Sequence, residues 1–316
     1  NPFIGTAWNG HTFPGAAWPF GIVQPSPDTG LGDWQHCSGY VYLDPWILGF
    51  SQTHLNGTGC SDLGDILLQP FTGEDPVDRD DFRGAKDFAS EMAYPGYYTV
   101  AMTNFGVRAE LTAAPHVGWH RYTFPEGKKA RVLVDLQYGC VREFKVFTHV
   151  ASATNWIAAG NSSIIGHNIL SAWLQARHVG FVVEFSKPFA VHRVLPKKEF
   201  EKANRYVLDF DLKPGEQLLA KVAISGVDPY GDSPLRMTDI FLDAERRLQL
   251  EFNGYRGDRP TAYRLLRSET PDFADFSVLT DGVFEGDAAS GTTIWTGTDP
   301  VTAPTGFYKV EAQPAQ

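Results

Sequence analysis

The chain has 316 residues, of which 43% are hydrophobic and 13% aromatic, so it can build the core of one large or two medium domains. Its net charge of −10 argues against a nucleic-acid partner, because phosphate binding needs a basic surface. No apolar run reaches the roughly 18 residues that a membrane-spanning helix requires. We therefore expect no nucleic-acid partner and no membrane span.

The first 60 residues mix turn-forming Gly and Pro with tryptophan at an unusual density. Four tryptophans lie in this stretch: Trp8, Trp18, Trp34 and Trp46. The stretch is either an ordinary edge of a β domain or a surface built from loops that faces a ligand. Aromatic residues also order Gly- and Pro-rich loops, and we interpret Trp8, Trp18 and Trp46 in this structural way.

The next part of the chain is typical of antiparallel β structure. Its segments alternate or are β-branched, and turn chemistry such as "NFG" and "PEGKK" separates them. The predicted strands are 97–103, 107–114, 118–124, 130–136, 178–185, 204–212 and 214–225. Strands at this spacing predict an all-β fold, a large antiparallel β-sandwich.

One helix is predicted near the end of this domain, over 233–252, with Ser233 as its cap and Pro234 in its first turn. The segment also suggests a domain boundary, which we place after residue 244. Residues 245–316 then read as a set of short strands and turns that forms a small carboxy-terminal β domain. The predicted domains are thus 1–244 and 245–316.

Ordered sequence blocks in the first domain carry a resemblance to a known family. They are "NPFIGT", "GHTFPGA", "PFGIVQPSPDT", "CSGYVY", "GFSQTHLNGTGC", "GDILLQP", "YPGYYTV" and "HRYTF". Together with "FVVEFSKPF" and "GEQLLAKVAISGV", they resemble the amino-terminal domain of glycoside hydrolase family 92, the calcium-dependent α-mannosidases. The resemblance covers roughly residues 1–228.

The resemblance implies that two domains supply different parts of one active site. Family members join this β-sandwich to an (α/α)₆ barrel, and they are inverting exo-mannosidases with the active site between the two. The catalytic acid, the base and most of the Ca²⁺ site belong to the barrel, and the sandwich supplies loops to the sugar pocket. Residues 245–316 are far too few for such a barrel. We therefore assign no catalytic residue and no metal ligand to this chain, and whether it is itself an enzyme stays open.

Four residues are predicted to contact sugar: Trp34, His36, His54 and Asn56. Trp34 matches the first Trp of the family's "GWDWCSGY" block, and aromatic rings are the usual platforms for pyranoses. His54 matches the "GFSHTHLSGTG" block, and a histidine satisfied inside its own loop is the alternative. His36 and Asn56 stand where the family has Trp and Ser.

Other residues of the same loops depart from the family pattern or have a simpler explanation. Gln52 replaces a His in a loop that is expected to touch mannose. Asp62 and Asp65 match the family and are expected to fix a turn. The three cysteines, Cys37, Cys60 and Cys140, are interpreted as free thiols, with a Cys37–Cys60 disulfide as the alternative.

Three hypotheses of function follow. The chain is the sandwich part of an α-mannosidase that needs a barrel-domain partner, a module that binds mannose-containing glycans, or a non-enzymatic extracellular structural protein that self-associates. The carboxy-terminal domain resembles the small β domains that end many secreted bacterial proteins. We expect a bacterial protein in an extracellular or periplasmic location, with its signal peptide removed.

Overall fold

The computed structural model describes residues 1–30, 34–73, 82–139, 150–173, 176–199 and 201–226, together with seven strands between 237 and 313. Contacts divide the chain into two compact units, Asn1–Gly226 and Val227–Gln316. The division falls before the boundary that the sequence places after residue 244. The reason is that the segment interpreted as a helix forms two strands of the second unit, β17 and β18.

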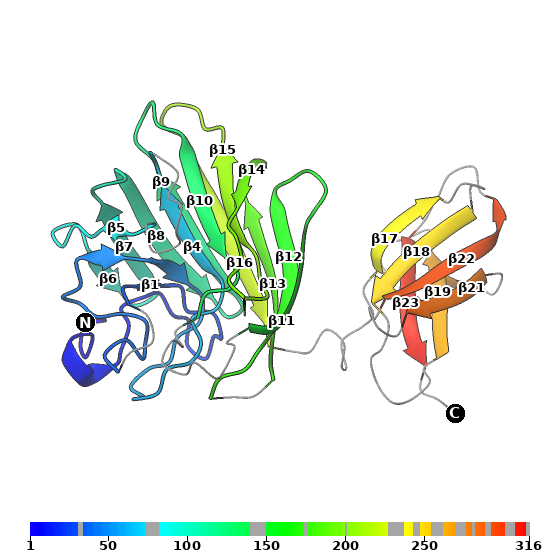
Figure 1. Ribbon diagram of the computed structural model, residues 1–316, viewed down its shortest axis with the longest axis horizontal. Coiled ribbons are helices and arrows are strands. Elements are labelled where there is room, and N and C mark those ends of the chain that lie inside the picture. The colour runs from blue at the N-terminus through cyan, green and yellow to red at the C-terminus, as the bar shows by residue number, and fades with distance from the viewer. Residues whose placement is uncertain are drawn as a thin grey trace. The chain divides into compact units, whose positions relative to one another are not determined.

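The first unit contains a six-stranded and an eight-stranded antiparallel sheet (Figure 1). The six-stranded sheet has the order β1-β3-β4-β10-β15-β14, the eight-stranded sheet has the order β11-β12-β13-β16-β9-β8-β7-β6, and β2 pairs with β5. The strand bounds are β1 Ser26–Asp28, β2 Trp46–Ile47, β3 Gly49–Ser51, β4 Leu67–Phe71, β5 Gly84–Ala85, β6 Met92–Tyr94, β7 Tyr97–Met102, β8 Val107–Ala114, β9 Val117–Thr123, β10 Ala130–Asp135, β11 Val150–Ile157, β12 Ser163–Leu170, β13 Arg177–Phe185, β14 Phe189–Val194, β15 Arg205–Phe210 and β16 Gln217–Ser225. A short 3₁₀ turn, η1, spans Trp8–Gly10.

The predicted strands are confirmed, because alternation in the sequence becomes alternation in burial. In β9, His120 and Tyr122 point into the core, while Trp119 and Arg121 point to the outer face. Strand β16 follows the same rule, with Leu218 buried beside an exposed Leu219. A strand with period two can bury one face only, so this register is fixed by the core.

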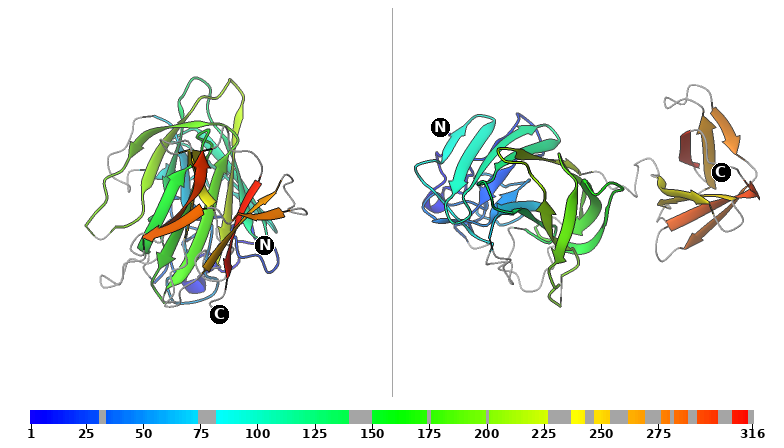
Figure 2. Two further views of the ribbon diagram at one scale, coloured as in Figure 1. Left: turned by 90° about the vertical axis from the view of Figure 1, so that its right-hand side faces the viewer. Right: turned by 90° about the horizontal axis from the view of Figure 1, so that it is seen from above.

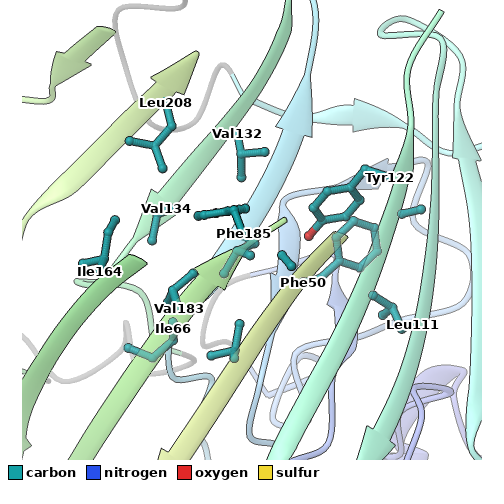
Figure 3. Packing of buried hydrophobic residues seen from close by; sticks show 14 of the residues in the cluster. Phe50, Ile66, Leu111, Tyr122, Val132, Val134, Ile164, Val183, Phe185 and Leu208 are labelled. Carbon is teal, nitrogen blue, oxygen red and sulfur yellow. The ribbon is translucent and has the colours of Figure 1, made fainter. Parts of the chain in front are cut away.

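The core lies between the two sheets (Figure 3). The six-stranded sheet contributes Val132, Val134 and Leu208, and the eight-stranded sheet contributes Val183 and Phe185. All five side chains are buried. Close packing of such a core makes the sandwich a rigid support for its loops.

The second unit has seven described strands in two antiparallel sheets, with the orders β17-β18-β22-β21 and β20-β19-β23 (Figures 1 and 2). Their bounds are β17 Met237–Leu242, β18 Arg247–Asn253, β19 Ala262–Ser268, β20 Phe276–Leu279, β21 Gly282–Asp287, β22 Thr292–Pro300 and β23 Phe307–Gln313. The helix predicted over 233–252 is therefore wrong. Strands β17 and β18 pair with each other, and β18 pairs with β22, about forty residues further along the chain.

Candidate functional site

Three loop segments meet around Trp34. The Trp34 ring contacts the ring of His11 edge-on, with 5.0 Å between the ring centroids, and the backbone N–H of Gly57 donates to the carbonyl oxygen of His11 over 2.7 Å. A Cβ atom on Gly59 would lie 2.3 Å from the indole of Trp34. Only glycine therefore lets this loop approach the ring so closely.

Trp34 is held in place and remains open to solvent. Its side chain is 55% exposed, although His11 and Gly59 pack against it. A fixed and exposed indole offers a flat apolar surface to the carbon-rich face of a pyranose. Asn56 is exposed in the loop that contacts Trp34, and its carboxamide can both donate to and accept from a hydroxyl group. Of the four predicted contacts, these two are accessible.

His36 faces the protein. Its Nε2 lies 2.7 Å from Oδ2 of Asp44, which also accepts from the hydroxyl of Thr29. Burial raises the pKa of Asp44, but the hydrogen bonds from His36 and Thr29 outweigh burial and leave that pKa below its usual value. The imidazole also lies against Gly30, where a Cβ atom would come within 2.1 Å of the ring. In this structure His36 ties together the loop that carries Trp34.

His54 is buried among partners of its own. Its Nδ1–H donates to the carbonyl oxygen of Gln24 over 2.9 Å, and its Nε2 lies 3.0 Å from Oγ of Ser51 and 3.3 Å from Oδ1 of Asp28. Oδ2 of Asp28 accepts from the backbone N–H of Ser51. These contacts fit the alternative interpretation of a histidine satisfied inside its loop, and they leave no ring nitrogen facing solvent.

Gln52, which the sequence placed among the residues near mannose, lies in the core. Its Nε2 donates to the carbonyl oxygen of Phe50, and its Oε1 accepts from Nε2–H of His120 over 3.1 Å. Nδ1 of His120 accepts in turn from the hydroxyl of Tyr122. Burial lowers the pKa of His120 to about 3, so the ring is neutral near pH 7. The departure from the family at position 52 therefore changes the packing beneath the loops rather than the surface.

Arg177 is a residue that sequence reasoning missed. Its guanidinium lies 2.5 Å from Oδ2 of Asp65 and 3.5 Å from Oδ1 of Asp62, and Asp65 also accepts from Thr53. Both carboxylates are buried, and Leu63 between them has a φ of +66°. The two acids fix a turn, as expected, but the cation that holds them comes from β13. No local signal in the sequence identifies a partner 112 residues away from Asp65.

The described loops show no metal-binding cluster. Among the described residues, no group of three or more His, Cys, Asp or Glu side chains is placed to hold a metal ion. Cys37 and Cys60 are not joined in a disulfide, and Cys140 lies outside the described residues. No helix among the described residues is long and apolar enough to cross a membrane.

Known proteins share this sandwich. An α-mannosidase of family GH92 from Bacteroides thetaiotaomicron is similar in structure, with a TM-score of 0.62 and 34% identity over 72% of this chain and 33% of that one. An inverting mannosidase of the same family and organism has a TM-score of 0.60 at 24% identity, over 72% of this chain and 31% of its own, and this likeness shows the fold. An uncharacterized secreted glycosidase of Arthroderma benhamiae is 31% identical over 146 residues, which are 42% of this chain and 19% of that protein.

The chain thus spans about a third of the length of the solved mannosidases that it matches and about a fifth of the fungal glycosidase. The sequence model of the glycosyl hydrolase family 92 N-terminal domain matches residues 1–225, which is almost all of the first compact unit. The match covers the blocks that carried the resemblance and the loops around Trp34. The chain belongs to the glycosyl hydrolase family 92 N-terminal domain family.

Proposed function

We propose that the sandwich forms one wall of an α-mannoside-binding site, centred on Trp34, and binds the sugar without hydrolysing it alone. The observation that carries this proposal is the Trp34 ring, 55% exposed yet braced by His11 and Gly59. A ring held in place before binding loses little freedom when a sugar stacks on it. Asn56 supplies a polar group nearby, and His36 and His54 hold the loops in place. Mannose is the proposed sugar because a similar solved structure is that of an α-mannosidase.

The carboxylates of the described loops support a binding role rather than catalysis. An inverting glycosidase needs an acid and a base with their carboxyl groups about 6.5–9.5 Å apart and a water between the base and the sugar. Asp44 is bonded to His36 and Thr29, while Asp62 and Asp65 are paired with Arg177. Carboxylates committed to structural partners are poorly suited to transfer protons. We therefore assign the acid and the base to groups outside the sandwich.

Exposed apolar side chains of the amino-terminal loops favour a second domain that packs against them and completes the site. Ile4 is 76% exposed, Trp8 74%, and Phe20 is fully exposed. At this exposure Trp8 does not pack inside its loop, in contrast to the structural interpretation from the sequence. Trp8 and Phe20 also have positive φ values, of 55° and 61°, a conformation that costs energy outside glycine. Exposed apolar groups of this size mark interaction sites. We propose a barrel-type domain as this partner, in an extracellular setting.

A second candidate function rests on the same exposed side chains. If the apolar loops bind another copy of the chain, the protein is a self-assembling structural element. Sedimentation velocity at rising protein concentration separates the two functions. Association that Phe20→Ser and Trp8→Ser abolish, in a protein that binds no sugar, would favour self-assembly.

The direct test of the proposed function is calorimetric titration of α-mannobiose into the full chain, followed by assay of the same samples for released mannose. Wild type should bind weakly and release no mannose, and Trp34→Ala should bind at least about tenfold more weakly. The matched control is Trp156→Ala, because Trp156 is 44% exposed on β11 and belongs to none of the loops around Trp34. Equal affinity of Trp34→Ala and wild type would refute the binding site. Release of mannose by the pure chain would refute the assignment of catalysis elsewhere.

A further inference from the structure

A groove lies on the outer face of the eight-stranded sheet, and none of its lining residues belongs to the loops around Trp34. Its volume is about 250 Å³, and residues of β7, β8, β9 and β16 line it. These four strands are successive neighbours in the sheet (Figure 1). In the register of the sheet, Tyr97 pairs with Thr112, and Thr112 pairs with Trp119. All three side chains point outward, because their strand neighbours Tyr98, Leu111 and His120 are buried. The floor of the groove is thus a threonine between two aromatic residues.

The two rings are spaced and exposed in a way that suits an extended ligand. Tyr97 and Trp119 lie two strands apart, which is about 9.5 Å across the sheet. Trp119 is 40% exposed. On its other side Lys221 places its ammonium group 5.3 Å from the ring centroid and is itself paired with Glu184 over 2.8 Å. Lys221 thus contacts the indole from the β16 side, and the groove lies on the opposite side of Trp119, towards Tyr97.

A fixed polar edge runs along the neighbouring row. Glu110 accepts from the hydroxyl of Tyr97 over 2.7 Å and from Nε and Nη2 of Arg121 over 2.7 and 2.6 Å. The hydrogen bond from Arg121 holds the pKa of Glu110 below its usual value, although burial opposes it. A guanidinium has five N–H donors, and Glu110 takes two of them. The Arg121 side chain, which is 48% exposed, keeps donors for a ligand.

We propose that this groove is a second glycan-binding site, in which a pyranose stacks on Trp119 and its hydroxyl groups bond to Arg121 and Glu110. The combination of an open aromatic surface with a fixed, charged, hydrogen-bonding edge matches a ligand with one apolar face and a polar rim. An apolar peptide does not match this groove, because it would remove water from the Glu110–Arg121 pair and offer no hydrogen bonds in its place. Eight residues line the groove, far fewer than the 20–30 residues a side of a stable protein interface. The site shares its ligand class with the proposed function but none of its residues.

The test is retardation of the full chain in native gels that contain yeast mannan, xylan or hydroxyethylcellulose. We expect at least one of these polysaccharides to retard the wild type, and Trp119→Ala to bind it about tenfold more weakly. Trp119→Phe keeps a flat ring and should retain part of the affinity, which separates loss of stacking from loss of folding. Arg121→Met should weaken binding, and urea unfolding of the same variant shows that the chain is still folded. Trp156→Ala on β11 should behave like wild type.

The outcomes separate this site from the one around Trp34. If Trp34→Ala alone abolishes retardation, the groove is refuted and the proposed function stands. Loss in Trp119→Ala alone supports the groove and counts against Trp34, whereas partial loss in each supports two sites. No retardation by any of the three polysaccharides overturns the groove. So does a Trp119-dependent dimer in sedimentation without glycan binding, because the face would then be an interface between copies.

Discussion

The buried His120 predicts a defined loss of stability in mild acid. The ring lies in the core between Gln52 and Tyr122, and burial lowers its pKa from 6.5 to about 3. The unfolded chain binds a proton below pH 6.5, whereas the folded chain does not until about pH 3. The contribution of the neutral ring to the free energy of unfolding is therefore fully present above pH 6.5, and it is lost as the pH drops from 6.5 towards 3.

The size of the effect follows from the shift. Each pH unit between the two pKa values removes about 1.4 kcal/mol from the free energy of unfolding. Between pH 7.5 and pH 5 this single group should therefore remove about 2 kcal/mol, a large part of the 5–15 kcal/mol typical of a domain. The estimate applies to a fully buried ring, so solvent screening does not reduce it.

The assay is urea unfolding of the full chain at several pH values between 5 and 7.5, followed by tryptophan fluorescence. The signal reports mainly on the sandwich, because Trp295 is the one tryptophan after Gly226. The comparison variant is His120→Gln, whose amide can still donate to Gln52 and accept from Tyr122 but does not titrate. Subtracting its pH dependence from that of the wild type isolates His120, since the two proteins differ at this residue alone.

We expect the wild type to lose about 2 kcal/mol more than His120→Gln between pH 7.5 and 5. Parallel curves for the two proteins would contradict a lowered pKa of the buried His120. They would mean that His120 accepts a proton in the folded state, and hence that the ring is solvated or opposite a charge that the structure does not place there.

Three further substitutions test the supports beneath the loops, each by urea unfolding. Arg177→Ala should cost about 3–5 kcal/mol, because it leaves the buried Asp65 and Asp62 without their cation; a loss below 1 kcal/mol would contradict the pairing. Nζ of Lys86 lies 3.5 Å from Oε2 of Glu91, and both side chains are buried. Lys86→Met should cost a similar ~3–5 kcal/mol by leaving this buried carboxylate without its cation, and Lys86→Met/Glu91→Gln should recover most of the loss. Gly30→Ala should cost about 1–3 kcal/mol, because the added Cβ would collide with the ring of His36. The control is Gly226→Ala, because a Cβ atom at Gly226 has no neighbour within 4 Å. Equal stability of the two variants would count against the contact between Gly30 and His36.

The sequence predicted the sandwich because its strands bury one face. Alternation in β8, β9 and β16 is visible in the amino-acid order, and the same alternation appears in their burial. The prediction of a helix over 233–252 is wrong because the strand pairing of this segment is not local. Strand β18 is paired on one side with β22, which starts at Thr292. The Ser233 cap and Pro234 signal favours a helix, and a local pattern cannot reveal a strand partner that lies some forty residues away.

A motif gives the order of residues but not their burial, so the sequence cannot separate the accessible residues of the candidate site from the buried ones. Trp34 and Asn56 are exposed, while His54, two residues before Asn56, is bonded to Gln24 and Ser51 inside the protein. Neighbours in a loop can point in opposite directions, and only the fold decides between them. The same limit applies to Arg177, whose importance depends entirely on the approach of β13 to the loop.

The indole N–H signals in a ¹H–¹⁵N correlation spectrum test most directly whether a mannoside binds against Trp34. The chain has eight tryptophans, and single Trp→Phe variants assign their signals. On titration with α-mannobiose, the Trp34 signal should shift progressively and saturably, while the Trp156 signal stays in place. A Trp34 signal that does not move at saturating sugar, whether or not another indole responds, would contradict the claim.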